Sequence, residues 1–248
     1  MLAFAAVAAG QTRDIPYLPT NNKHKLDIYL PEGKKHFPVL FFVHGGAWRL
    51  GDRSKYRAIG EHFAAQGIGV VIPSYRLAPV YRHPAQIEDV AAAFAWTVKN
   101  IKQYGGDTSR LYIAGHSAGG HLVSLLALDE KYLKAQQLSR RNIAGVVSIS
   151  GVDKISKLEW NFGTAEEERQ DASPIAHVSR GAPPFLIMYC QRDIITLASQ
   201  AKALNQALLE AKVKSELLLL PGKNHRNEVY AIADGNDRGE QAILEFVR

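Results

Sequence analysis

The chain has very little cysteine, since Cys190 is the only one among its 248 residues. A single cysteine cannot form an internal disulfide or a cysteine-rich metal site, so folds that depend on either are excluded. Cys190 directly follows the apolar run 185–189, where a small buried hydrophobic side chain is expected rather than a reactive thiol. Cysteine chemistry therefore gives no indication of the function.

Long hydrophobic runs are also lacking, and none reaches the roughly 18 apolar residues that a membrane-spanning helix needs. The stretch MLAFAAVAAG at residues 1–10 resembles the tail of a secretory signal peptide, but no basic segment precedes it. We expect residues 1–12 to be either the remnant of such a leader or a short N-terminal segment. The first alternative implies a secreted or periplasmic protein and the second a cytoplasmic one, and neither includes a membrane span.

Repeats, low-complexity tracts and Pro- or Gly-rich linkers are absent as well. Hydrophobic residues make up 46% of the chain and charged residues 22%, which is typical of a globular protein and not of a disordered one. The length suits one large α/β core. We therefore predict a single domain over residues 13–248.

The formal net charge of +6 is not concentrated in any segment. Basic residues are scattered, with only short pairs such as Lys34-Lys35 and Arg140-Arg141. Binding to nucleic acid requires basic residues clustered on one surface. We expect no nucleic-acid partner, and either a monomer or a homodimer.

Apolar runs of strand length alternate along the chain with segments of helical period. The predicted strands lie at residues 26–30, 37–44, 69–73, 111–114, 143–149, 184–189 and 217–220. The predicted helices lie at about residues 56–66, 84–104, 118–128, 197–211 and 239–247. This alternation predicts an α/β fold in which helices cover both faces of a mostly parallel sheet of about eight strands. Ligands of such sheets bind beyond the carboxyl ends of the strands, so the residues just after each strand are the candidates for a site.

The first motif is the pentapeptide GHSAG at residues 115–119, which matches G-x-S-x-G and lies between a predicted strand and a predicted helix. A nucleophile elbow turns sharply between two such elements, and its glycines permit a strained backbone and close packing around the serine. Ser117 would then lie at a helix N-terminus, where free backbone N–H groups favour a developing oxyanion. Ser117 is therefore the predicted nucleophile.

The second motif is HGGAW at residues 44–48, directly after an almost continuously apolar strand. Acyl transfer needs N–H donors aimed at the oxyanion of a tetrahedral intermediate, and glycines let main-chain amides face the site. We predict that the N–H groups of Gly45, Gly46 and Ala118 form this oxyanion hole.

With these two motifs the chain resembles the α/β-hydrolase esterases that have an HGG oxyanion loop. This grouping contains carboxylesterases similar to hormone-sensitive lipase, feruloyl and acetylxylan esterase-like proteins, isoprenylcysteine methylesterase-like proteins and kynurenine formamidases. Further matching stretches are SYRLAP at 74–79, YGGD at 104–107 and SPI at 173–175. The resemblance implies the α/β-hydrolase fold and acyl-transfer chemistry without a metal or other cofactor. It does not specify the substrate, because one fold hosts many acyl chemistries.

One stretch departs from the pattern of this grouping. Ser74 stands where many relatives have an aspartate. The ion pair usual at this place is therefore in doubt, whereas the catalytic assignment is unaffected.

The acid and the histidine of the predicted triad follow the nucleophile in chain order, each just after a strand. Asp193 and His225 both lie just beyond a predicted strand. Asp153 follows an earlier strand and is an alternative acid, but its position favours Asp193 for this role. We predict Ser117 as nucleophile, His225 as general base and Asp193 as the carboxylate that orients the histidine, with a covalent acyl-enzyme intermediate.

The other histidines show no metal-ligand spacing such as H-E-x-x-H, so no metal site is predicted. We expect surface or packing roles for His36, His62, His83, His121 and His177. Asp89 is expected to stabilise the long helix. Trp48 and His116 are expected either to line the acyl or alcohol pocket or simply to pack.

The one sizeable insertion between predicted strands covers about residues 152–180 and indicates a short cap. Interfacial lipases usually have a larger amphipathic lid, so small soluble esters with short acyl chains are the expected substrates. The predicted function is carboxylic ester hydrolysis, with aryl formamide hydrolysis and acetylxylan or feruloyl ester hydrolysis as open alternatives. A ligand-binding relative without catalysis is a further alternative, against which the complete set of Ser117, Asp193 and His225 argues.

Overall fold

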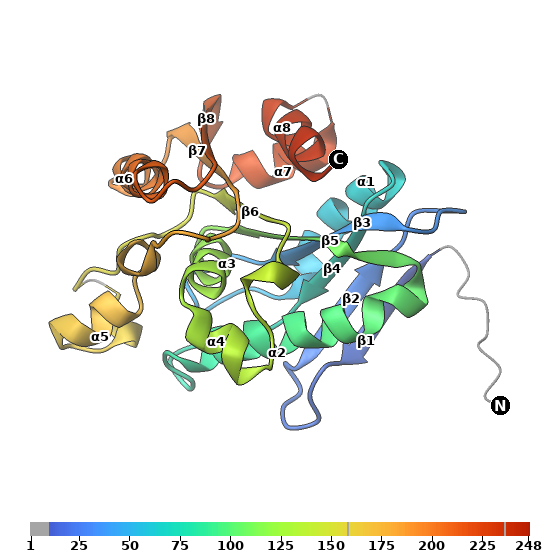
Figure 1. Cartoon of the computed structure of the whole chain (residues 1–248), viewed down its shortest axis with the longest axis horizontal. Coiled ribbons are helices and arrows are strands. Elements are labelled where there is room, and N and C mark those ends of the chain that lie inside the picture. Colours follow the sequence, from blue (N-terminus) through green and yellow to red (C-terminus); the bar gives the residue numbers. More distant parts are fainter. Residues whose placement is uncertain (1–9, 158, 236) are drawn as a thin grey trace.

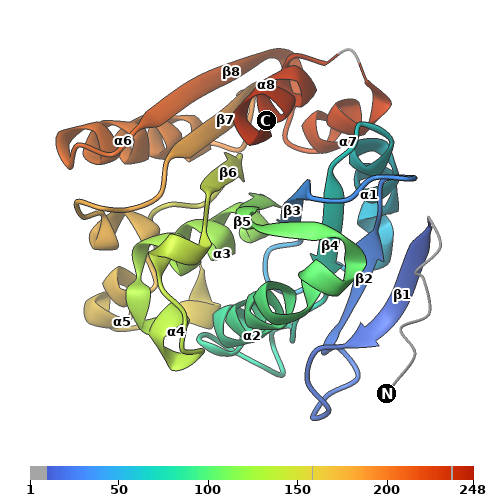
Figure 2. The ribbon, with the colours of Figure 1, turned by 45° about the vertical axis from the view of Figure 1, so that its right-hand side comes forward.

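The computed structural model describes residues 10–157, 159–235 and 237–248 of the protein. In these residues eight strands form one sheet in the order β1-β2-β4-β3-β5-β6-β7-β8, with β1 at one edge and β8 at the other (Figure 1, Figure 2). The strands are β1 (Gln11–Pro16), β2 (Lys25–Tyr29), β3 (Phe37–Val43), β4 (Gly69–Pro73), β5 (Gly106–His116), β6 (Gly145–Ile149), β7 (Phe185–Arg192) and β8 (Ser215–Asn224). Strand β2 is antiparallel to β1 and β4, and the other neighbouring strands are parallel. The prediction of a mostly parallel sheet of about eight strands is confirmed.

The central strands are buried on both faces. Every residue of β3, β4 and β6 is buried, in agreement with their nearly continuous apolar sequences. Strand β1 was not predicted, because its sequence QTRDIP is polar and its residues are largely exposed at the edge of the sheet. Residues 11 and 12, which we assigned to a leader remnant or N-terminal segment, begin β1, and residues 1–9 lie outside the described part.

Helices cover both faces of the sheet. Side chains of α2 (Ala85–Asn100), α3 (Ala118–Leu128), α4 (Glu130–Ala135) and α6 (Leu197–Glu210) belong to one hydrophobic core, and those of α1 (Arg57–Ala65), α7 (Asn227–Asp234) and α8 (Arg238–Val247) to the other. Phe41 and Phe42 are adjacent on β3 and lie in the two different cores, because successive side chains of a strand point to opposite faces. The short helices α4 and α7 were not predicted.

The carboxyl ends of the parallel strands bring the predicted site residues to one edge of the sheet. Strands β5, β7 and β8 each end at the residue before a predicted triad member, namely Ser117, Asp193 and His225. Strand β3 ends just before the HGGAW loop. Because the carboxyl ends of parallel strands meet at the same edge, four segments that are distant in the sequence converge there.

The residues for which a short cap is predicted, about 152–180, lie in the segment between β6 and β7. It holds α5 (Glu166–Asp171) and two 3-10 turns, Trp160–Phe162 and Pro174–His177. Helix α5 lies at the end of the molecule away from β1 and β2 (Figure 1, Figure 2). Among the described residues, no helix is both long enough and apolar enough to cross a membrane.

Candidate active site

Ser117 lies at a sharp turn between β5 and α3. Its backbone φ of 56° and ψ of −119° lie outside the regions that non-glycine residues favour. The Ser117 N–H donates to the Ile149 carbonyl at 2.8 Å, and the Ser117 carbonyl accepts from the His121 N–H at 3.0 Å. A Cβ atom at Gly119 would lie 2.1 Å from the Val43 carbonyl oxygen, so only glycine permits this approach of α3 to β3. The local sequence thus produces the strained strand-to-helix turn expected of a nucleophile elbow.

The structure brings the three predicted triad side chains together. His225 Nε2 lies 2.9 Å from the hydroxyl oxygen of Ser117, and His225 Nδ1 lies 2.7 Å from Asp193 Oδ1. The side chain of Asp193 is 2% exposed and that of His225 is 16% exposed. When Nδ1 carries the hydrogen, it donates to the carboxylate and Nε2 accepts the serine hydroxyl. This tautomer is the one that a general base needs.

Hydrogen bonds keep the Asp193 carboxyl ionised. Burial by itself would raise its pKa, but hydrogen bonds from His225, from the Ser150 hydroxyl at 2.6 Å and from the Ile194 N–H at 2.8 Å outweigh burial. They hold the pKa of Asp193 below its ordinary value. The carboxylate is therefore negatively charged at neutral pH, where it can stabilise a positively charged imidazole beside it.

The HGGAW loop turns beside Ser117 through left-handed backbone conformations. The φ angle is 124° at Gly46 and 52° at Ala47. A Cβ atom at Gly46 would lie 2.1 Å from the Leu50 carbonyl oxygen, so the turn requires glycine at this position. In the described part of the chain, the N–H groups of Gly46 and Ala118 donate no hydrogen bond, and Ala118 lines the same cavity as Ser117.

Gly45 differs from the prediction. Its N–H donates to the Tyr56 hydroxyl at 3.0 Å and is therefore already used. Ala47, which the sequence did not single out, lines the same cavity as Ser117 and Ala118. The two glycines of the motif looked equivalent in the sequence, because the hydroxyl that distinguishes them comes from a separate segment.

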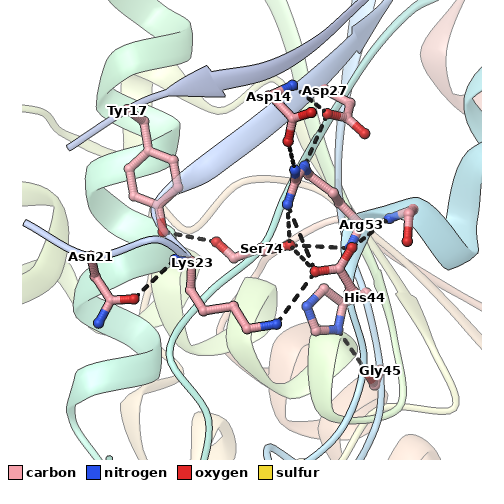
Figure 3. A network of polar contacts seen from close by, with 11 residues as sticks. Asp14, Tyr17, Asn21, Lys23, Asp27, His44, Gly45, Arg53 and Ser74 are labelled. Carbon is pink, nitrogen blue, oxygen red and sulfur yellow. Dashed lines mark hydrogen bonds and ion pairs between the residues drawn. The ribbon is translucent and has the colours of Figure 1, made fainter. Parts of the chain in front are cut away.

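A network of charged and polar groups lies beside His44 and Gly45 (Figure 3). Arg53 Nε donates to Asp27 Oδ1 at 2.9 Å, and Arg53 Nη1 donates to the Ser74 hydroxyl at 3.1 Å. The Ser74 hydroxyl in turn donates to Asp52 Oδ2 at 3.1 Å. The departure at position 74 therefore does not leave Arg53 without carboxylate partners, since Asp27 and Asp52 supply them.

His44 is neutral and shapes the loop. Burial lowers its pKa to about 4. Its ring stacks on Tyr75 with 4.3 Å between ring centroids, and its Nδ1 lies 2.8 Å from the Gly45 carbonyl oxygen. The Tyr75 hydroxyl donates to the His44 carbonyl at 3.0 Å. These contacts fix the start of the HGGAW loop.

A cavity of about 950 Å³ opens beside Ser117. It lies between the loop residue Trp48, Ile155 in the segment after β6, and the exposed pair Ile194 and Ile195 after β7. This volume is at the upper end of the range for small-molecule sites, and the lining combines apolar and charged side chains. Trp48 therefore lines the pocket. It also contacts α3, because its Nε1 donates to His121 Nδ1 at 3.2 Å.

The structure places His116 elsewhere than in the pocket. Among the described residues that line the cavity, His116 does not appear. Its Nε2 lies 2.9 Å from the His225 carbonyl oxygen and 3.3 Å from Glu228 Oε1, and its Nδ1 lies 3.3 Å from the Tyr56 hydroxyl. His116 is next to Ser117 in the sequence, but its side chain contacts the backbone of His225. Glu228, to which no sequence motif points, also lies in this region.

Asp153, the alternative acid, has no contact with His225 in the described chain. Its side chain is buried, and neither carboxylate oxygen accepts a hydrogen bond from a described residue. Burial raises its pKa to about 7. Asp193, and not Asp153, is the carboxylate that contacts His225.

The raised pKa of Asp153 predicts a specific pH dependence of stability. The folded state keeps a proton on this carboxyl up to about pH 7, whereas the unfolded state releases it near 3.8, so the free energy of unfolding falls as pH rises through this window. We expect Asp153→Asn to remove this loss. At pH 8 its free energy of unfolding should be about 1–3 kcal/mol higher than that of wild type. Urea unfolding at pH 4 and pH 8 measures it. An equal pH dependence in both proteins would contradict the expectation.

Three groups of possible metal ligands lie close together in the described residues: His116–His225–Glu228, Cys190–Asp193–Glu228 and Asp129–Asp171–His177. In the third group Lys131 Nζ lies 2.9 Å from Asp129 Oδ2 and 2.6 Å from Asp171 Oδ1, so a positive charge is already present. In the first group His225 Nδ1 already bonds to Asp193. In the first and third groups, therefore, some of the possible ligand atoms already contact other side chains of the described chain.

Comparison with known proteins agrees with this geometry. Residues 26–208 match the BD-FAE family model. Esterase LipC of Mycobacterium tuberculosis (strain ATCC 25618 / H37Rv) is 35% identical over 232 residues, which cover 84% of this chain and 57% of LipC. The isoprenylcysteine alpha-carbonyl methylesterase ICME of Arabidopsis thaliana is 27% identical, with 82% of this chain and 54% of that protein covered. The chain thus spans little more than half the length of these two curated relatives.

Solved structures with the same fold cover nearly the whole chain. A truncated form of a carbohydrate esterase from gut microbiota superposes with a TM-score of 0.83 at 21% identity, covering 98% of this chain and 97% of that one. Esterase B from Lactobacillus rhamnosis superposes with a TM-score of 0.81 at 23% identity, covering 96% and 86%. The predicted α/β-hydrolase fold is confirmed.

Proposed function

The chain belongs to the BD-FAE family and has the α/β-hydrolase fold, and on that premise we propose that it hydrolyses carboxylic esters with Ser117, His225 and Asp193 as its catalytic triad. The observation that supports this most directly is the continuous contact from the serine hydroxyl through both ring nitrogens of His225 to the Asp193 carboxylate. The names of the similar proteins, which are esterases, agree with it.

The proposed reaction has two halves. His225 Nε2 takes the hydroxyl proton while the Ser117 oxygen bonds to the ester carbonyl carbon, and the carbonyl oxygen becomes an oxyanion. The imidazolium then gives its proton to the alcohol oxygen as that carbon–oxygen bond breaks, which leaves an acyl-serine. Water repeats the same proton transfers and releases the carboxylic acid and free Ser117.

The oxyanion hole in this proposal is formed by backbone N–H groups. Gly46 and Ala118 are the preferred donors because nothing in the described chain uses their hydrogens, and Ala47 is a third. Each such donor contributes about 3–4 kcal/mol of barrier lowering in acyl-transfer enzymes. Gly45 is assigned a supporting role through its bond to Tyr56.

We propose small esters with short acyl chains as substrates. The segment between β6 and β7 is short, and its only α-helix in the described residues is α5, with six residues. A larger amphipathic lid is typical of enzymes that act on long-chain lipids. The cavity of about 950 Å³ also gives room for the alcohol part of an ester.

Acyl-chain preference tests the substrate proposal. On a series of p-nitrophenyl esters we expect kcat/KM to be highest for acyl chains of roughly two to four carbons. For long acyl chains kcat/KM should be at least about ten-fold lower, because we expect the site to offer few contacts to the additional methylene groups. Ser117→Ala protein serves as the blank. A profile that peaks at long acyl chains would overturn the short-chain assignment.

The same assay separates the alternative activities. N-formylkynurenine and acetylated xylan are added to the panel, and a higher kcat/KM on either one would replace the simple ester as the substrate class. Labelling by a fluorophosphonate tests catalysis itself, since this reagent reacts with an activated serine. Wild-type protein that neither hydrolyses any member of the panel nor takes the label would be a ligand-binding relative.

A further inference from the structure

Glu228 is a buried carboxylate without a conventional partner. It lies in the first turn of α7, three residues after His225, and is fully buried. Neither of its oxygens accepts a hydrogen bond from a described residue. Burial of a carboxylate without hydrogen bonds costs several kcal/mol in general, so its presence here requires an explanation.

Titratable groups from three segments face this carboxylate. Glu228 Oε1 lies 3.3 Å from His116 Nε2, at the end of β5, and 3.8 Å from His225 Nδ1, just after β8. From the β7 side, ligand atoms of Cys190, Asp193 and Glu228 lie within 4.8 Å of one another. Two carboxylates, Asp193 and Glu228, thus share the Nδ1 side of a single imidazole.

We propose that Glu228 is a positioning residue for the reaction, a second carboxylate that stabilises protonated His225 and accepts its Nδ1–H when Asp193 is absent. This inference rests on the proposed esterase function. Glu228 does not touch substrate and exchanges no proton in the intact enzyme. It acts through His225 alone.

The charge of Glu228 has most effect at the transition state. In the proposed mechanism His225 accepts the serine proton as a neutral ring, with which a carboxylate 3.8 Å away interacts weakly. When Nε2 takes the serine proton the ring becomes positive, and both buried carboxylates attract it. Interactions that strengthen only at the transition state raise kcat and leave KM unchanged. Glu228 is therefore expected to affect kcat.

His116 offers a competing explanation that the test must separate. Its Nε2 contacts both Glu228 and the His225 carbonyl oxygen, so Glu228 could serve only to hold His116 in place. In that case the shape of residue 228 matters, and its charge does not. Glu228→Gln keeps the shape and removes the charge, whereas Glu228→Asp keeps the charge and shortens the side chain.

The first experiment compares these two variants on a short p-nitrophenyl ester. We expect Glu228→Gln to lower kcat about 10-fold with KM within about two-fold of wild type, and Glu228→Asp to retain more activity than the glutamine variant. Glu240→Gln is the matched control, because Glu240 is also a buried glutamate paired with a histidine, His62, at 2.9 Å. It should leave kcat unchanged. A glutamine variant as active as wild type, with a poorer aspartate variant, would overturn the proposal.

The second experiment measures coupling between the two carboxylates. With Glu228 present, Asp193→Ala should lower kcat about 10²-fold, and in the Glu228→Gln background the same substitution should cost about 10⁴-fold, as in triads with one acid. Should the glutamine variant not fold, Glu228→Asp takes its place, with a larger Asp193→Ala loss expected than in wild type. Equal losses in both backgrounds would overturn the proposal. If wild-type protein hydrolyses esters and the Glu228 variants do not change kcat, only this inference is wrong. If wild-type protein is inactive and takes no fluorophosphonate label, the proposed function is wrong as well.

Discussion

Ser117→Ala is expected to lower kcat for ester hydrolysis by about 10⁴- to 10⁶-fold, with the fold intact. Without the hydroxyl no acyl-enzyme forms, and only the oxyanion donors and substrate binding remain. The variant should also lose all labelling by a fluorophosphonate, which mass spectrometry of the intact chain measures. Steady-state rates on a short p-nitrophenyl ester give the loss in kcat.

Ser124→Ala is the matched control for this substitution. Ser124 lies on α3, is fully buried, and its hydroxyl has no hydrogen-bond partner among the described residues. Removing an unpartnered hydroxyl should change stability and activity little. More than about one hundredth of wild-type kcat in Ser117→Ala, or label on another serine, would show that the nucleophile is misassigned.

Gly119→Ala is expected to destabilise the protein by about 3 kcal/mol or more, or to prevent folding. The added Cβ atom would lie 2.1 Å from the Val43 carbonyl oxygen and 2.7 Å from the His44 carbonyl oxygen. Both are backbone atoms, so α3 or the start of the HGGAW loop must move. Any folded fraction should therefore also have a lower kcat. Urea unfolding followed by circular dichroism measures the change.

Gly222→Ala is the control for the glycine substitution. An added Cβ atom at Gly222 meets no atom within 4 Å, although the φ of 71° is unfavourable for alanine. Its expected cost is about 1–2 kcal/mol, from backbone strain alone. If Gly119→Ala were no more destabilising than Gly222→Ala, the close packing of α3 on β3 would not be required for the elbow.

Much of the fold could be predicted because each central element carries its own signal. The sequence FPVLFFV of β3 is apolar at every position, as a strand buried on both faces must be. The edge strand β1 carries no such signal, because QTRDIP pairs with one neighbour and stays largely exposed. Helix α7 has eight residues, too few to show a clear period beside the loop that holds His225.

The candidate site divides in the same way. Ser117 could be identified because its neighbouring glycines are required by the local backbone, and Asp193 and His225 because each follows a strand. Gly45 was assigned to the oxyanion hole because nothing near it in sequence reveals the Tyr56 hydroxyl that accepts its hydrogen. His116 and Glu228 owe their places to contacts between β5 and the segment after β8.

The sequence by itself determined the strands of the central sheet, the sharp turn at Ser117 and the placement of Ser117, Asp193 and His225 just after strands, because apolar runs, glycines and spacing act over short distances along the chain. Only the tertiary structure decided which amides are free, which carboxylate contacts His225 and that Glu228 lies beside it. These depend on atoms from segments up to 109 residues apart, which meet because parallel strands bring their carboxyl ends to one edge.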